Sequence, residues 1–270
     1  MARTKTANVP DTSALLMTPS PLLLAVEQAV MRGSDWSRAS VSIADRVAAH
    51  LAGAITLDRV QAGQRLLEKD ISEVLHVSRA PVREALRILE RDRLVEFKSR
   101  RGAIVTAPDA AELRDIFTVR SALYGILLTQ VMQDAPDELA AVFTNHVPKL
   151  AKAAEDGVDA YALEGFLLNM AVFGLCRNRL LADMLKSISL RTLRYVRLGL
   201  AGSRQAIPRS LRTWRTLQRA IVARDVPAVI EIARRRMDDT REAAVRAIVP
   251  KRPGAPAAPA APLRTAVIRP

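Results

Sequence analysis

The chain contains little cysteine, little histidine and few aromatic residues. Its 270 residues include one cysteine and three histidines, and 4% of the residues are aromatic. The single cysteine, Cys176, excludes an internal disulfide and a zinc site built from several cysteines. Cys176 lies in the apolar run MAVFGLC, so we expect a buried packing residue rather than a nucleophile.

The motifs of common catalytic sites are also missing. The sequence has no activated-serine motif, no Gly-rich phosphate-binding loop, and no histidine paired with a carboxylate at a useful spacing. We therefore do not expect an enzyme.

Long hydrophobic runs are absent as well. No apolar run reaches the length of a membrane span, and the segment TPSP separates the N-terminal runs LLM and LLLAV. We therefore expect no membrane span and no signal peptide, and we expect a protein of the reducing cytoplasm. Membrane association through the apolar patch at residues 22–30 is a weaker alternative, because it rests on that patch alone.

Basic residues, in contrast, are abundant. Lysine and arginine number 41 against 28 aspartates and glutamates, which gives a net charge of +13 and a pI of about 10.9. Such an excess favours an anionic or polyanionic partner. Arginine supplies 34 of these basic residues in an alanine-rich sequence, so GC-rich coding is an alternative explanation for the same excess.

Composition divides the chain into two tails and two blocks. Residues 1–39 have scattered proline, serine and threonine, and we expect a flexible arm with at most a turn or short helix. Residues 249–270 are Pro/Ala-rich and cannot hold a packed core. Between them, residues 40–107 mix helix and strand patterns, whereas residues 109–248 have helical patterns throughout.

The first block begins with two predicted helices. Ile43, Val47, Leu51 and Ile55 recur at four-residue steps and give one helix a single apolar face. The segment EKDISEVL, at residues 68–75, predicts a second and shorter helix. A tight turn through residues 76–77 leads out of it.

The stretch HVSRAPVREALRIL, residues 76–89, predicts the next helix. Ser78 is a good N-cap, and Pro81 lies in the first turn, where its missing N–H costs nothing. Arg79, Arg83 and Arg87 are spaced by four residues, on or near the face opposite the apolar one. Such a stripe belongs either to an ordinary solvated face or to a helix that reads bases in the major groove.

The segments LVEFK and AIVTA predict two short strands joined by SRRG, with Gly102 at the hairpin corner. Two helices joined by a tight turn and followed by a basic hairpin form a winged helix-turn-helix. In this motif arginines at the start of the second helix bond base edges, and Arg100 and Arg101 of the hairpin can reach the backbone or minor groove. We predict a mainly α protein, with this domain at 40–107 and an all-helical bundle of six or seven helices at 109–248.

The core of the first block, AGQRLLEKDISEVLHVSRAPVREALRILERDRLVEFKSRRGAIV, resembles the GntR family of bacterial transcription regulators over residues 42–105. The resemblance implies sequence-specific binding to double-stranded DNA. The residues expected at the DNA are Lys69, Ser78, Arg79, Pro81, Arg83, Arg101 and Gly102. His76 replaces the glycine that is common in the turn, and histidine tolerates a left-handed conformation better than most side chains. Arg87 and Arg91 have a second interpretation, as solvated side chains or partners of Glu84 and Glu90.

The second block resembles the FCD ligand-sensing domain of the FadR-type branch of that family. Asp109 and Glu112 make a capping-box-like start to its first helix. LRDIFTVRSAL resembles the opening of the domain and contains Arg120, and RNRLLADML resembles a later segment. LQRAIVARDVPAVIEIARRRM resembles its last two helices.

Many members of this branch hold a divalent metal through one aspartate and three histidines, and this sequence departs from that pattern. The four corresponding positions carry Gly165, Asn169, Trp214 and Arg236. None of these residues supplies the imidazole or carboxylate lone pairs that such a metal requires. The three histidines of the chain lie outside the pattern, so we predict no family-type metal and no other cofactor.

Basic residues gather in the second block, where residues 177–241 contain 16 arginines and lysines against 5 acidic residues. This charge favours a small anionic effector held directly by side chains. The residues expected at such a ligand are Arg120, Asn169, Arg191, Arg194, Trp214 and Arg236. In an alternative interpretation, Trp214 fills the vacated metal cavity and the arginines face water. In a third, the pocket has lost its sensing role and another partner exerts control.

These features predict a homodimeric transcriptional regulator on a pseudo-palindromic operator. We expect a repressor that is released by a small organic anion of the carboxylate type. The alternative is a constitutive DNA-binding protein with a degenerate second domain. Thermal stabilisation by sugar acids or other carboxylates separates the two, because a ligand that binds only the native state raises its melting temperature.

Overall fold

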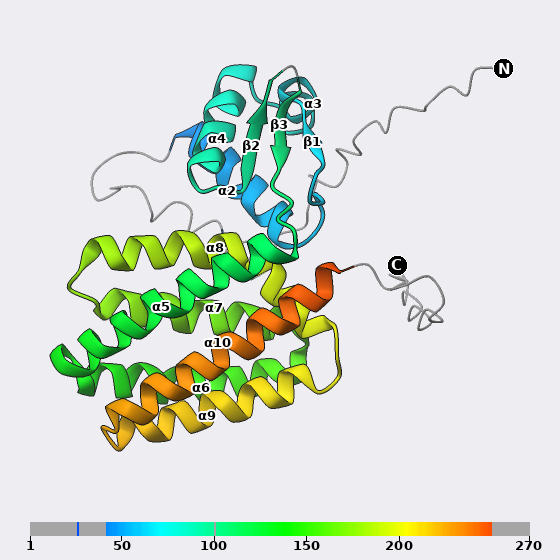
Figure 1. The fold of residues 1–270 in the computed structure, drawn as a ribbon. Helices are drawn as coiled ribbons and strands as arrows, with labels where there is room; N and C mark the ends of the chain where they lie inside the picture. The colour runs from blue at the N-terminus through cyan, green and yellow to red at the C-terminus, as the bar shows by residue number, and fades with distance from the viewer. Residues whose placement is uncertain (1–25, 27–41, 100, 250–270) are drawn as a thin grey trace, which may run out of the picture.

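The computed structural model describes residue 26, residues 42–99 and residues 101–249. They form a small N-terminal domain of helices and strands above a larger helical domain (Figure 1). The predictions for the arm at 1–39 and the tail at 249–270 concern residues outside the described part, apart from Val26 and Val249. The predicted fold class, a helix-turn-helix domain followed by a helical domain, is confirmed.

The N-terminal domain contains three helices and a three-stranded antiparallel sheet within the residues described. Its elements in chain order are α2 (Ile43–Thr56), β1 (Arg65–Leu66), α3 (Glu68–Val74), α4 (Arg79–Arg91), β2 (Val95–Lys98) and β3 (Gly102–Val105). The strand order is β1-β3-β2, and the hairpin pairs Val95 with Val105 and Lys98 with Gly102. Strand β1 was not expected from the sequence, because two residues are too few to show an alternating pattern.

Local residue chemistry fixes the turns of this domain. Ser42 and Asp45 form a reciprocal capping box at the start of α2. Between α3 and α4, His76 adopts the left-handed conformation with φ 52°, as its place in the turn predicted. Ser78 occupies the N-cap position of α4, but its side chain makes no capping hydrogen bond, which differs from the expected role of its hydroxyl.

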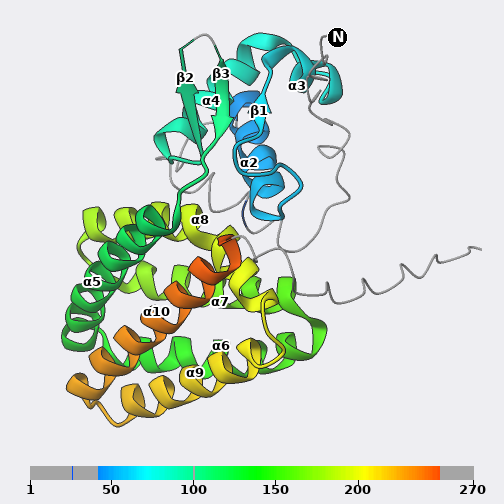
Figure 2. The same cartoon turned by 45° about the vertical axis from the view of Figure 1, so that its right-hand side comes forward.

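The helical domain is built from six helices within residues 109–249, in agreement with the predicted six or seven. They are α5 (Ala110–Asp134), α6 (Pro136–Asp156), α7 (Val158–Leu175), α8 (Arg179–Ala201), α9 (Ala206–Val222) and α10 (Val226–Ile248). Asp109 caps α5 by accepting from the amides of Ala111 and Glu112. In both views, α8 lies next to the N-terminal domain and α6 and α9 lie farthest from it (Figures 1 and 2).

Helix α7 corrects the expectation that no apolar run reaches the length of a membrane span. Over 18 residues its mean hydropathy is 1.3, so by length and composition alone it could cross a membrane. In the structure α7 packs against α6 and α8, and Tyr161, Phe166 and Phe173 are buried. Its apolar character is therefore that of a core helix in this domain. Cys176, which follows it, is buried as predicted.

The two domains share one apolar cluster. Leu163 and Phe166 of α7 and Leu190 and Leu193 of α8 pack in the same cluster as the buried residues of α2. Beside it, Arg194 of α8 pairs with Asp58, which follows α2, and the hydroxyl of Tyr195 donates to the carbonyl of Thr106 over 3.5 Å. Helices α7 and α8 therefore both contact the N-terminal domain, and α8 also supplies the ion pair and the hydrogen bond.

Candidate DNA-binding surface and ligand cavity

The start of α4 is the exposed basic end of the helix-turn-helix. Val82, Ala85, Leu86 and Leu89 form the buried face of α4. Their burial leaves Ser78 and Arg79 exposed at its N-terminal end, and Pro81 is half-buried within the first turn. A helix with an apolar inner face and a basic outer start has the shape of a recognition helix.

The second arginine of this surface, Arg83, is not a free cation. Its Nε and Nη2 donate to the two carboxylate oxygens of Glu68 over 3.0 and 2.9 Å. This bidentate bond raises the pKa of Arg83 and lowers the pKa of Glu68. The side chain of Arg83 therefore has a fixed direction, set by the first helix of the motif.

The other candidates on this surface are arranged around α4. Lys69 on α3 lies 3.8 Å from Glu73 in an exposed pair. Arg87 pairs with Glu90 at 2.8 Å and lies over the ring of Phe97, which fits the second interpretation that its sequence allowed.

The tip of the wing lies at the turn between β2 and β3. Arg101 and Gly102 are exposed there, and the Arg101 amide donates to the carbonyl of Lys98. Gly102 takes φ 72°, so it closes the hairpin in a conformation that suits glycine. Arg100 lies outside the described residues.

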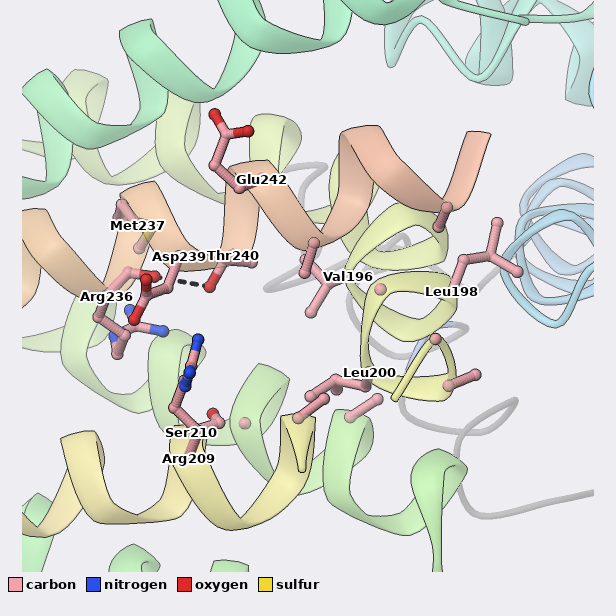
Figure 3. A pocket seen from close by; sticks show the side chains of 18 of the residues that line it. Val196, Leu198, Leu200, Arg209, Ser210, Arg236, Met237, Asp239, Thr240 and Glu242 are labelled. Atoms are coloured by element: carbon pink, nitrogen blue, oxygen red, sulfur yellow. Dashed lines mark hydrogen bonds between the residues drawn. The ribbon is translucent and has the colours of Figure 1, made fainter. Parts of the chain in front are cut away.

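A cavity of about 1030 Å³ opens in the helical domain, lined by residues of α5, α7, α8, α9 and α10 and of the connection between α8 and α9 (Figure 3). Its lining includes the residues at all four of the family's metal positions, Gly165, Asn169, Trp214 and Arg236. The structure therefore brings together residues that lie far apart in sequence. Within the described part of the chain, no group of three or more histidine, cysteine, aspartate or glutamate residues could hold a metal ion.

Arg236 is a buried cation in the lining of this cavity. Its guanidinium carbon lies 3.9 Å from the centre of the Trp214 ring and 5.6 Å from that of Tyr124, so the cation stacks on aromatic faces. Only 7% of the residue is exposed, and its Nε and Nη2 have no hydrogen-bond partner. Burial lowers the pKa of Arg236.

Arg120 is a second buried cation in the same lining. It is 5% exposed, its Nη1 donates to the hydroxyl of Thr192 over 2.9 Å, and its Nε has no partner. Burial, and after it the charge of Arg236, lowers the pKa of Arg120 to about 9. Two guanidinium groups therefore lie close enough to repel each other.

Neutral polar groups complete this part of the lining. The Asn169 amide donates to the carbonyl of Gly165 over 2.7 Å, and its Oδ1 has no partner. Tyr161 donates to Ser210 over 3.0 Å, and burial raises the pKa of Tyr161 to about 12. Ser189 presents a buried hydroxyl without a partner. These neutral groups therefore offer an occupant one acceptor, Asn169 Oδ1, and one hydroxyl, that of Ser189, which can donate or accept.

Two of the six residues predicted at the ligand lie elsewhere. Arg191 pairs with Glu112 at 2.9 Å, and Arg194 pairs with Asp58 of the N-terminal domain. Neither belongs to the cavity lining, which contains the other four. They were predicted at the ligand because of their charge alone. In the structure, each pairs with a carboxylate that is distant in the sequence and lies outside the cavity lining.

Several lining residues were not anticipated. Ser189 is an ordinary polar residue in a helix, and its sequence context gives no signal that it faces a cavity. Arg209 of α9 extends into the space below α10 (Figure 3). It belongs to the basic run at 177–241, so charge alone singled out its segment but not the residue.

Comparison with known proteins agrees with this architecture. Residues 43–105 match the family described as bacterial regulatory proteins, gntR family, and residues 115–239 match the FCD domain. The chain is 33% identical over 122 residues to an uncharacterized HTH-type transcriptional regulator in the TAR-I ttuE-ttuC' intergenic region of Agrobacterium vitis, and covers 71% of it. It is 32% identical over 103 residues to the gluconate operon transcriptional repressor of Bacillus licheniformis, a match that covers 38% of this chain and 41% of that protein.

Among solved structures, a putative transcriptional regulator GntR from Rhodococcus sp. RHA1 matches 75% of this chain and 97% of its own. Its TM-score is 0.63 at 23% identity, so the likeness is one of fold. The chain spans less than half the length of several curated relatives that it matches. The paired family matches and the Agrobacterium vitis relative show that the chain belongs to the GntR family of bacterial regulatory proteins, as a DNA-binding transcriptional regulator with an FCD domain.

Proposed function

We propose that the chain is a homodimeric repressor whose binding to a pseudo-palindromic operator is modulated by a small organic anion in the cavity of the helical domain. The observation that carries the proposal is a cavity lined by two buried arginines, Arg120 and Arg236, in a chain that also presents an exposed basic recognition helix. Uncompensated buried charges are costly, so an anion is the occupant that such a lining favours.

Repression is supported by one relative, whose name is gluconate operon transcriptional repressor. An effector that binds the helical domain would have to favour one placement of the DNA-binding domains over another. The shared cluster between α2 and α8 offers a route, because Phe166 and Leu193 belong both to that cluster and to the cavity lining. We propose the cytoplasm as its location, since that is where a bacterial regulator meets its operator.

A dimer is supported by an exposed apolar surface on the helical domain. Val119 and Ile126 of α5 and Leu180 and Met184 of α8 are large apolar residues that are 43–72% exposed. Helices α5 and α8 run antiparallel, since Glu112 pairs with Arg191 near one end and Asp134 with Arg177 near the other. The four exposed apolar residues therefore lie on two adjacent helices, which suits a second copy of the chain. Sedimentation at micromolar concentration should give twice the mass of 29.5 kDa.

DNA recognition is tested with the wild-type protein, Arg79→Ala and a control, Arg91→Ala, on the DNA upstream of its own gene and on competitor DNA. Loss of a bidentate base contact costs roughly 1–3 kcal/mol, so Arg79→Ala should weaken specific binding at least about fivefold and nonspecific binding much less. Arg91 is an exposed residue in the last turn of α4, and its substitution should change both affinities equally. Equal affinity of the wild type for both DNAs would contradict sequence-specific binding.

Modulation is tested by titrating sugar acids and other carboxylates into the operator complex and following fluorescence anisotropy. Release of DNA by one of them, lost in Arg236→Gln, is the expected result. A chain that binds its operator with unchanged affinity across the series would instead be the constitutive DNA-binding protein, and the effector part of the proposal would be wrong.

A further inference from the structure

We infer that the cavity takes a ligand with a compact dianionic head, seated on Arg120 and Arg236, and an apolar body that lies along Val196 and Leu200. The inference rests on the proposed function, because it names the chemistry of the effector in that same cavity. Phosphate monoesters and malonate-type dicarboxylates share such a head.

The two buried arginines carry positive charges that no ion pair among the described residues neutralises. Arg120 and Arg236 are each at least 93% buried, and within the part of the chain that the structure describes no ion pair joins either of them to a carboxylate. The lining contains two carboxylates, Asp239 and Glu242, of which Glu242 pairs with Arg241. Apart from each other, their neighbours are Tyr124, Thr192 and the Trp214 ring, all of them neutral. A single negative charge would leave one buried cation uncompensated, whereas a dianion compensates both.

The buried part of the lining has more unpartnered hydrogen-bond donors than unpartnered acceptors. The Nε of Arg120, the Nε and Nη2 of Arg236 and the hydroxyl of Ser189 are buried without partners, and all three residues line the cavity. Among the fully buried acceptors of the lining side chains described, Asn169 Oδ1 has no partner, whereas the lining carboxylates of Asp239 and Glu242 lie in less buried positions. A surplus of donors matches a group with several acceptor oxygens, and a phosphate monoester carries three.

The cavity extends beyond the two arginines toward apolar side chains of α8. Figure 3 shows Arg236, Arg209 and Ser210 toward one end of the cavity and Val196 and Leu200 toward the other. Val196 and Leu200 are one turn apart on α8 and therefore share a face. A cavity of about 1030 Å³ is at the upper end of the range that takes drug-sized ligands, so a small acid would leave most of it empty.

The test compares probes that differ in head or tail, with binding measured by isothermal titration calorimetry on the full chain. The probes are hexyl phosphate, hexylmalonate, heptanoate and inorganic phosphate. Hexyl phosphate should bind at least about tenfold more tightly than heptanoate, which has the same apolar tail but only one negative charge. It should also bind at least about tenfold more tightly than inorganic phosphate, which has no tail. Because this comparison uses the wild-type protein, it does not depend on the folding of a variant.

Substitutions then locate the two ends of the ligand. Arg236→Gln and Arg120→Gln should each weaken hexyl phosphate at least about tenfold. Arg235→Gln removes the same charge from the next position on α10, where the side chain is exposed and pairs with Glu231, and should leave binding unchanged. Leu200→Asn should weaken hexyl phosphate without weakening inorganic phosphate.

The outcomes separate this inference from the proposed function. Tight binding of hexylmalonate beside hexyl phosphate supports the dianionic head in its carboxylate form. Equal or tighter binding of heptanoate overturns the dianion, and equal binding of inorganic phosphate overturns the apolar body. If no probe binds, or if Arg235→Gln costs as much as Arg236→Gln, the inference is wrong. A monocarboxylate that releases operator DNA while hexyl phosphate does not would overturn the inference and leave the proposed function standing.

Discussion

At the scale of single residues, Glu68 and Arg83 link the two helices of the helix-turn-helix. The bidentate bond between them crosses from the start of α3 to the outer face of α4. It directs one arginine of the recognition surface, and it also places a carboxylate beside three arginines, since Arg83, Arg79 and Arg87 all lower the pKa of Glu68. A negative charge at that place opposes the approach of phosphates that the arginines do not bind directly.

Replacing Glu68 by glutamine should therefore loosen DNA recognition. With the bond weakened and one negative charge removed, nonspecific affinity should rise a few-fold, while the ratio of specific to nonspecific affinity falls. Salt-dependent anisotropy with operator and random DNA measures both. Glu73→Gln is the matched control, because it removes the same charge from α3, where Glu73 makes only a 3.8 Å exposed contact with Lys69. The same change in both variants would mean that charge alone, and not the direction of Arg83, is responsible.

At the scale of secondary structure, three consecutive residues of α8 contact three different parts of the molecule. Thr192 accepts a hydrogen bond from Arg120, Leu193 lines the cavity and the shared cluster, and Arg194 pairs with Asp58. One turn later, α8 crosses α10 at Gly199. A Cβ atom at Gly199 would lie 2.9 Å from backbone atoms of Ala243 and Ala244, so glycine sets the closest approach of these two helices.

Gly199→Ala should consequently destabilise the helical domain. The added methyl meets backbone, which cannot rotate away, and overpacking of this kind costs typically about 1–3 kcal/mol. Alanine also gains up to about 1 kcal/mol in helix propensity, so the net loss should be at the lower part of that range. Thermal unfolding followed by circular dichroism gives the change in melting temperature.

Gly125→Ala in α5 is the control for that measurement. A Cβ atom at Gly125 meets no atom within 4 Å, so only the propensity term remains and the melting temperature should rise. Stabilisation by both substitutions would show that α8 and α10 are free to move apart.

At the scale of the whole molecule, the two domains are held by an apolar cluster with one buried arginine beside it. The Arg194 side chain is 9% exposed, and apart from its bond to Asp58 its Nε and Nη1 have no partners. Asp58 has φ 60°, a conformation that asparagine also tolerates. The pair can therefore be broken by a substitution that keeps the backbone of the turn.

Asp58→Asn should loosen the contact between the domains. The substitution removes the negative charge from a hydrogen bond that contributes about 1.5–3 kcal/mol, and it leaves the guanidinium of Arg194 buried without a counter-charge. Hydrogen exchange should become faster both at the end of α2 and along residues 190–195. Asp159→Asn removes a comparable pair with Arg197 inside the helical domain and should not change exchange in α2. Unchanged exchange in α2 after Asp58→Asn would show that the apolar cluster alone holds the domains.

Features that depend on residues close together in the sequence could be predicted from it, whereas features that depend on distant residues could not. The start of α4, the turn at His76 and the cap at Asp109 depend on residues within a few positions, so their patterns were readable. Arg191 and Arg194 were misplaced because their partners, Glu112 and Asp58, lie 79 and 136 residues away. The family spacing predicted that Gly165, Asn169, Trp214 and Arg236 lie near one another, and all four line one cavity. The spacing could not indicate that Arg236 stacks on Trp214.

That stack gives the protein an optical signal of its own. The chain has two tryptophans, Trp36 and Trp214, and the indole of Trp214 lies 3.9 Å from a guanidinium that an anion would engage. An occupant that draws Arg236 away from the ring, or excludes water beside it, changes the surroundings in which the indole emits. With Trp36 replaced by phenylalanine, the emission of Trp214 would follow the filling of the cavity in real time, without a label and without DNA.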